Sequence, residues 1–81
     1  MSPREIRYKE YAERLSEAME DKGVKSHQRA STIALWCSRE TKNPEFARRW
    51  LRGCNLPREA DQVTLAERLN VSLDWLKFGS D

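Results

Sequence analysis

Residues 33–53 read IALWCSRETKNPEFARRWLRG and decide the fold that this sequence predicts. Before residue 41, apolar side chains recur at three- and four-residue steps and predict a short helix that ends near Glu40. After it, Asn43 is a favoured N-cap, Pro44 fits the first helical position, and Glu45 complements the positive end of the helix dipole. The segment therefore predicts two short helices with only about three residues between them.

Two short helices with this connection have the spacing of a helix-turn-helix, a motif whose second helix enters the major groove of DNA. We expect this motif at about residues 28–53, with its second helix at 44–52. On a helical wheel, one face of the second helix is mostly apolar and holds Ala47, Trp50, Leu51 and Cys54. The other face holds Glu45, Arg48, Arg49 and Arg52. We interpret Trp50, like Trp36, as a core residue, because Trp buries a large apolar area.

Helical patterns also flank this segment. The capping box Ser2-Pro3-Arg4-Glu5 predicts a helix that starts near Pro3 and carries an apolar stripe to Lys22, where Gly23 ends it. A fourth helix is expected from about Glu59 to Leu69, with an inward face formed by Val63, Leu65, Ala66 and Leu69. A last short helix is expected over 73–78, capped by Ser72 and ended by Gly79. The prediction is an all-α fold of five helices in one domain, residues 1–81.

The net charge of +2 is unevenly distributed along the chain. Residues 1–26 are neutral, residues 27–58 carry seven cations against two anions, and residues 59–81 have a charge of −3. Six of the seven central cations are Arg. A block of +5 is typical of a phosphate-binding surface but also of an ordinary basic surface, and charge alone leaves both open.

Composition excludes several classes of protein. Cys37 and Cys54 lie 17 residues apart and His27 is the only histidine, so we expect no disulfide framework, no metal and two small buried thiols. A chain of 81 residues without a Gly-rich phosphate loop does not suggest an enzyme or a cofactor. The longest apolar run has five residues and no secretory signal is evident, so we expect a cytoplasmic protein without a membrane span.

The sequence resembles the helix-turn-helix family of phage-repressor and Cro-like proteins, also called Xre or lambda-repressor-like, over roughly residues 8–79. The resemblance rests on Asn43-Pro44 before the second helix, Trp50-Leu51-Arg52-Gly53 at its end, and the run LAERLNVSLDWLKFG at 65–79. It implies a compact five-helix domain that binds double-stranded DNA. It also implies that the second helix of the motif reads bases with Asn43, Pro44, Glu45 and Arg49.

The chemistry of these side chains agrees with such a role. Arg49 can donate two hydrogen bonds to guanine, Glu45 can accept one from cytosine, and Pro44 can touch a thymine methyl group. For Glu45 we favour an ion pair with Arg48 or Arg49 over base reading. The expected phosphate contacts are His27, Gln28, Arg29, Lys42, Arg48 and Arg52. For His27 the alternative is an exposed, neutral side chain next to the helix cap.

The last helix, 72–79, is apolar around too much of its circumference for a small domain to cover. We favour a homodimer interface formed by Leu73, Trp75, Leu76 and Phe78, and the alternative is that the first helix covers Trp75. The sequence thus predicts a transcriptional regulator, a repressor that binds a two-fold operator as a homodimer. The rival prediction is an antitoxin or adaptor whose last helix binds another protein.

Overall fold

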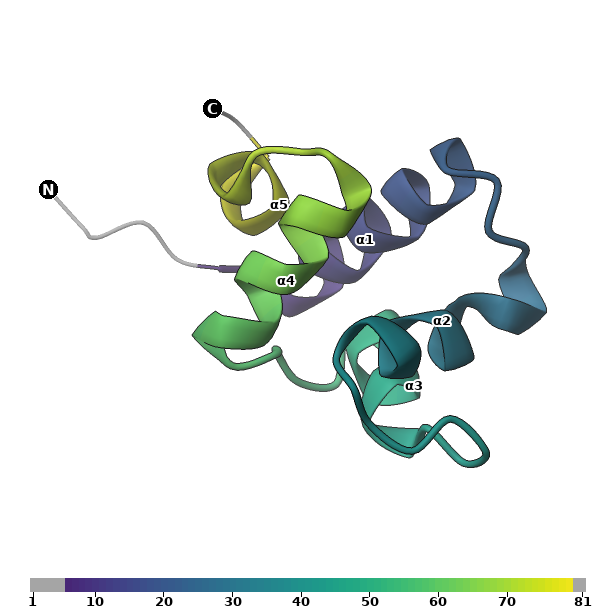
Figure 1. Cartoon of the computed structure of the whole chain (residues 1–81). Coiled ribbons are helices and arrows are strands. Elements are labelled where there is room, and N and C mark those ends of the chain that lie inside the picture. Colours follow the sequence, from purple (N-terminus) through teal and green to yellow (C-terminus); the bar gives the residue numbers. More distant parts are fainter. Residues whose placement is uncertain (1–5, 80–81) are drawn as a thin grey trace, which may run out of the picture.

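The computed structural model describes residues 6–79, which form five α-helices and one short 3-10 helix (Figure 1). The elements in chain order are α1 (Tyr8–Asp21), η1 (Ser26–Gln28), α2 (Arg29–Trp36), α3 (Glu45–Arg52), α4 (Glu59–Leu69) and α5 (Leu73–Phe78). The predicted all-α globule of five helices is confirmed, and residues 6–79 contain no strand. No helix in this range is long and apolar enough to cross a membrane.

The first helix, α1, packs against both α3 and α5. Its apolar stripe is buried along its length and consists of Tyr11, Ala12, Leu15, Ala18 and Met19. Helix α4 bridges α2 and α5. Every α-helix therefore contributes one buried face to the core, as the helical spacing of the apolar residues requires.

The start of α1 differs from the prediction. Helix α1 begins at Tyr8, while Arg7 is extended with φ −89° and ψ 116°. Ile6 is also non-helical, and it packs against the core. These two residues exclude the continuous helix that was expected from Pro3. The capping box at residues 2–5 lies outside the described residues.

The end of α2 also differs, and it lengthens the connection to α3. Helix α2 stops at Trp36 instead of near Glu40, because Ser38 adopts the left-handed conformation with φ 57°. The backbone N–H of Arg39 donates to the carbonyl of Ala34 at 2.8 Å, and that of Ser38 donates to Leu35, which is the hydrogen-bond pattern of a Schellman C-cap. Eight residues, 37–44, thus separate α2 from α3, where about three were expected.

The C-terminal ends of α3, α4 and α5 and the start of α5 follow the predictions. Gly53, Asn70 and Gly79 adopt left-handed conformations after α3, α4 and α5, and the Ser72 hydroxyl accepts a hydrogen bond from the Trp75 N–H at 2.9 Å. At Gly53 a side chain would also crowd the backbone of α1, since a Cβ atom would lie 3.1 Å from the Cα of Lys9.

Some side chains do not lie where the patterns placed them. Val63 was expected to face inward but is 38% exposed, because Asp61 and Gln62 take the buried positions of that turn. Both cysteines were expected in the core, yet Cys37 is half-buried and Cys54 is exposed. The two cysteines lie just after helices, where burial depends on the path of the chain beyond the helix, which periodicity does not describe.

Candidate nucleic-acid interface

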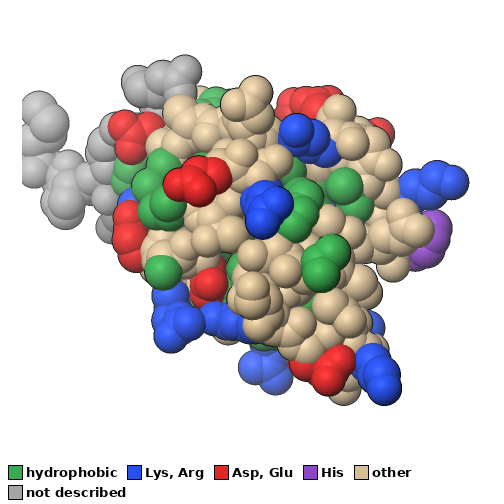
Figure 2. Space-filling model, in the orientation of Figure 1, with side chains coloured by type: hydrophobic (Ala, Val, Ile, Leu, Met, Phe, Trp, Pro, Cys, Tyr) green, Lys and Arg blue, Asp and Glu red, His purple; other side chains and the backbone are tan. Residues whose placement is uncertain are grey.

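Helix α3 has one packed face and one exposed face. Ala47 and Trp50 are buried against neighbouring helices, and Phe46 meets Trp50 edge-on with ring centroids 5.1 Å apart. Glu45, Arg49 and Arg52 are exposed, and Arg48 is partly exposed. The predicted packed face is confirmed at Ala47 and Trp50, whereas Leu51 is half-buried and Cys54, expected on the same face, is exposed. In Figure 2, Lys and Arg side chains follow the lower edge of the molecule, near α3 and the loop that precedes it in Figure 1.

The first turn of α3 is built differently from the prediction. Pro44 occupies the N-cap position, with φ −81° and ψ 63°, and its carbonyl accepts hydrogen bonds from the N–H groups of Ala47 and Arg48. The Pro44 side chain is fully buried. It therefore cannot touch a thymine methyl group, and its predicted role as a base contact is wrong.

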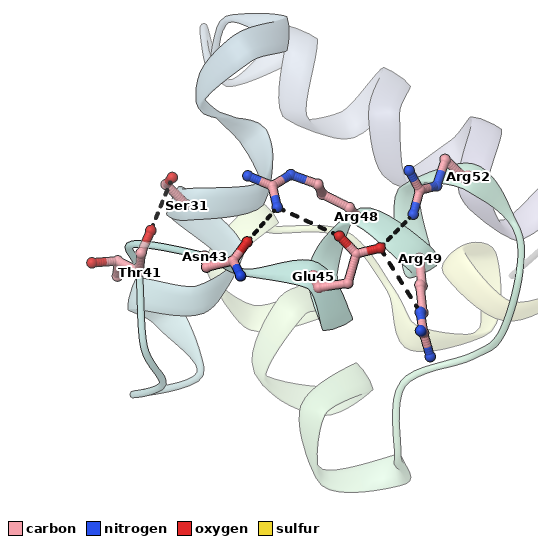
Figure 3. Close-up of polar contacts among 7 residues, drawn as sticks. All are labelled: Ser31, Thr41, Asn43, Glu45, Arg48, Arg49 and Arg52. Atoms are coloured by element: carbon pink, nitrogen blue, oxygen red, sulfur yellow. Dashed lines mark hydrogen bonds and ion pairs between the residues drawn. The ribbon is translucent and has the colours of Figure 1, made fainter.

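Asn43 does not cap α3. Its Oδ1 atom accepts a hydrogen bond from the Nη1 of Arg48 at 3.0 Å, and no side chain caps the helix (Figure 3). Asn43 remains exposed at the edge of the α3 face. The side chain thus positions Arg48, a role that its place before Pro44 does not reveal.

Glu45 lies at the centre of three arginines (Figure 3). Its Oε1 accepts a hydrogen bond from the Nη2 of Arg52 at 2.7 Å and lies 3.9 Å from the Nε of Arg49. Its Oε2 lies 3.5 Å from the Nη1 of Arg48. The expected ion pair of Glu45 with Arg48 or Arg49 is confirmed, and Arg52 forms the shortest contact of the set. We call Glu45, Arg48, Arg49 and Arg52 the arginine cluster.

The electrostatics of the arginine cluster follow from these contacts. The hydrogen bond from Arg52, reinforced by the charges of Arg52 and Arg48, holds the pKa of Glu45 below its ordinary value. The same hydrogen bond raises the pKa of Arg52. Glu45 is therefore ionised at neutral pH, and the four side chains carry a net charge of +2 on an exposed surface.

The residues expected to contact phosphate lie in two groups. Arg48 and Arg52 belong to the arginine cluster, and Lys42 is exposed in the loop just before α3. His27 and Gln28 are exposed in η1, at the other end of α2. Arg29 is partly buried, and its Nε donates to the carbonyl of Val24 at 3.3 Å, so this side chain is already engaged within the fold.

Arg39 has a structural role that the sequence did not indicate. Its Nη2 donates to the Oδ2 of Asp61 at 2.7 Å, and its guanidinium lies over the rings of Phe46 and Trp50, 4.8 and 5.8 Å from their centroids. Because Asp61 lies on α4, this cation ties the loop and α3 to the rest of the domain. The interaction spans 22 residues, and no local pattern signals it.

A shallow hollow of about 450 Å³ lies between α2 and the loop of residues 37–44. Leu35 lines it and is 67% exposed, which is unusual for a large apolar side chain. The Ser31 hydroxyl, which also lines the hollow, donates to the carbonyl of Thr41 at 3.4 Å and joins α2 to the loop (Figure 3). In the sequence, Leu35 either lies off the apolar stripe formed by Ala30, Ile33, Ala34 and Cys37 or widens it.

The apolar surface that α5 exposes for the expected dimer is smaller than predicted. Leu76 is fully buried in the core, so its predicted place in an exposed interface is wrong. Leu73, Trp75 and Phe78 are half-buried, and Trp75 lines a hollow with Ala18 of α1. Arg14 of α1 also anchors α5, since it donates to the carbonyls of Leu76 and Lys77 at 3.0 and 2.8 Å. These two bonds hold α5 against α1.

No protein-family model, curated protein or solved structure matches this chain. The chemistry of the exposed side chains is therefore the basis for a functional conclusion. Guanidinium groups present several N–H donors in one plane and can bind guanine edges or phosphate in a bidentate manner. The exposed face of α3 presents three of them within reach of one carboxylate.

Proposed function

We propose that this protein binds double-stranded DNA in a sequence-specific manner and acts as a transcriptional repressor. In this proposal α3 is the recognition helix and enters the major groove with Glu45 and Arg49, and Asn43 lies at its leading edge. Helices α2 and α3 act as a lambda-repressor-like helix-turn-helix whose turn is extended to residues 37–44.

One observation carries the proposal. Helix α3 is held by buried Ala47 and Trp50 on one side, while its other side presents Arg48, Arg49 and Arg52 to solvent. Cations that served only the helix dipole would gather in the last turn. Arg49 and Arg52 lie in that last turn of α3, but Arg48 lies in the turn before it, so the three arginines extend along the helix, which suits a helix that meets an anionic surface along its length.

The remaining polar and basic side chains fit phosphate contacts on either side of the groove. Lys42 lies before α3 and Arg52 at its end, while His27 and Gln28 lie at the start of α2. Contacts of this kind fix the position of a protein on the duplex, whereas base contacts give specificity. Arg29 and Arg39 are excluded from this set because their guanidinium groups bind within the fold.

Selection from a random pool of duplexes, followed by affinity measurement on the enriched sequence, tests the proposal. We expect Arg49→Ala to lose about 1 to 3 kcal/mol on the enriched sequence and to relax one base position, since a bidentate guanine contact has that value. Arg52→Ala should weaken binding without relaxing any single base position, as expected for a phosphate contact. Arg68→Ala is the matched control, because it removes the same charge from an exposed position on α4.

Two results would contradict the proposal. Equal losses on enriched and random DNA for Arg49→Ala would remove its role as a base-reading residue. If no sequence is enriched and another protein co-purifies with the chain, the antitoxin or adaptor function would replace DNA binding.

A further inference from the structure

We propose that Glu45 determines specificity by withholding the three arginines of its cluster from any DNA that does not offer its carboxylate a hydrogen-bond donor. This inference rests on the proposed DNA binding and adds a second role for the same surface. Glu45 would then lower affinity for most DNA and preserve it where a cytosine faces the first turn of α3.

In the free protein Glu45 accepts a hydrogen bond from Arg52 and lies within ion-pair distance of Arg48 and Arg49. Two carboxylate oxygens serve three guanidinium groups, with contacts of 2.7 Å to Arg52, 3.5 Å to Arg48 and 3.9 Å to Arg49. Arg48 is restrained further by Asn43 at 3.0 Å. A phosphate that approaches these arginines must compete with an anion that already occupies the centre of the cluster.

The position of Glu45 gives it access to base edges. Glu45 is the first residue of α3, and the N-terminal residues of a recognition helix are those that contact bases in the major groove. Its side chain is exposed and ionised, so it offers only acceptors. Among major-groove groups, the N4 amino group of cytosine is the donor that a carboxylate prefers.

These two properties predict opposite effects on two kinds of DNA. On DNA without a suitable cytosine, Glu45 keeps its arginines or is left facing phosphates of like charge, and binding is weakened. On DNA with that cytosine, the carboxylate binds the base and the arginines are released toward guanine and phosphate. If Glu45 only stabilised the N-terminus of α3, its substitution would lower the stability of the protein without changing the discrimination between the two kinds of DNA.

The test compares wild-type protein, Glu45→Gln and the control Glu67→Gln on a random-sequence duplex and on the sequence that wild type enriches. Glu67 is an exposed acid on α4, so the control removes the same charge elsewhere. We expect Glu45→Gln to bind random DNA about 3 to 10 times more tightly, and its ratio of specific to random affinity to fall about tenfold or more. Its slope of log affinity against log salt on random DNA should steepen by about one. Glu67→Gln should match wild type.

A repeated selection with Glu45→Gln should lose a C·G preference at one position of each half-site. Thermal unfolding followed by circular dichroism verifies that each variant is folded, and Glu45→Ala supplies a second variant without an amide donor. If wild type enriches a sequence but Glu45→Gln keeps the same random affinity and the same ratio, this inference is overturned while DNA binding stands. If wild type binds no DNA under any salt condition, the proposed function and this inference both fail.

Discussion

At the scale of single residues, the two cysteines occupy different surroundings. Burial, followed by the charge of Asp61, raises the pKa of the Cys37 thiol, and this residue is half-buried beside the end of α2. Cys54 is exposed just after α3. Because the thiolate is the reactive form, these surroundings protect Cys37 chemically as well as sterically.

We therefore expect iodoacetamide at pH 8 to label Cys54 at least about tenfold faster than Cys37 in the folded protein, since a thiol with a raised pKa holds less thiolate. Mass spectrometry of peptides over time measures both rates. Denaturant serves as the control, because unfolding should bring the two rates together. Equal rates in the folded protein would contradict the described burial of Cys37.

Residue-scale predictions from sequence succeeded where local chemistry decides and failed where packing decides. Glu45 was expected to pair with neighbouring arginines, and the spacing of one helical turn makes that outcome almost automatic. Pro44 was expected at an exposed helix start, yet its ring is fully buried. The preference of proline for the start of a helix does not indicate whether its ring faces the core or the solvent.

At the scale of elements, the loop of residues 37–44 is the largest departure from expectation. Its first turn depends on Ser38 in a left-handed conformation, which glycine adopts far more readily than serine. The sequence at this point contains no glycine, so nothing marked the early end of α2. The loop is then held by distant partners, namely Asp61 for Arg39 and Ser31 for Thr41.

The bond between Arg39 and Asp61 should be important for stability. Asp61 has a side chain only 11% exposed, and Arg39→Ala would leave this charge with the longer, exposed contact of Arg58 at 3.6 Å. We expect a loss of about 1 to 3 kcal/mol in the free energy of unfolding, as for hydrogen bonds to charged groups. Urea unfolding followed by tryptophan fluorescence measures it.

Arg7→Ala is the matched control for this prediction. It also removes an arginine from an ion pair, but the pair with Glu10 is 3.8 Å long and its side chains are 75% and 53% exposed. Arg7→Ala should change the free energy of unfolding by no more than about 0.5 kcal/mol. Indistinguishable midpoints for the two variants would show that Arg39 does not hold the loop to α4.

At the scale of the whole molecule, the proposed repressor requires two copies on a two-fold operator. The half-buried Leu73, Trp75 and Phe78 of α5 remain the proposed contact between copies. The net charge of −3 over residues 59–81 would keep this end of the molecule away from DNA, while the basic segment at 27–58 faces it.

The salt dependence of binding measures how many copies bind. If each copy neutralises about four phosphates, the slope of log affinity against log salt should be near −7 for a dimer, and half-sites should lie about 10 base pairs apart. Fluorescence anisotropy over a salt series gives the slope, and footprinting gives the spacing. A slope near −4 with a single protected half-site would show that one copy binds alone and would contradict the dimer.

The sequence by itself determined the helices, most of their ends and the two faces of α3, because spacing and capping act over three or four residues. Gly53, Ser72 and Gly79 set helix boundaries through local geometry that a reader of the sequence can recognise. Only the tertiary structure decided the path of residues 37–44, the burial of Leu76 and the bond that joins Arg39 to Asp61. These features depend on contacts between residues distant along the chain, and no local pattern specifies which distant partners will meet.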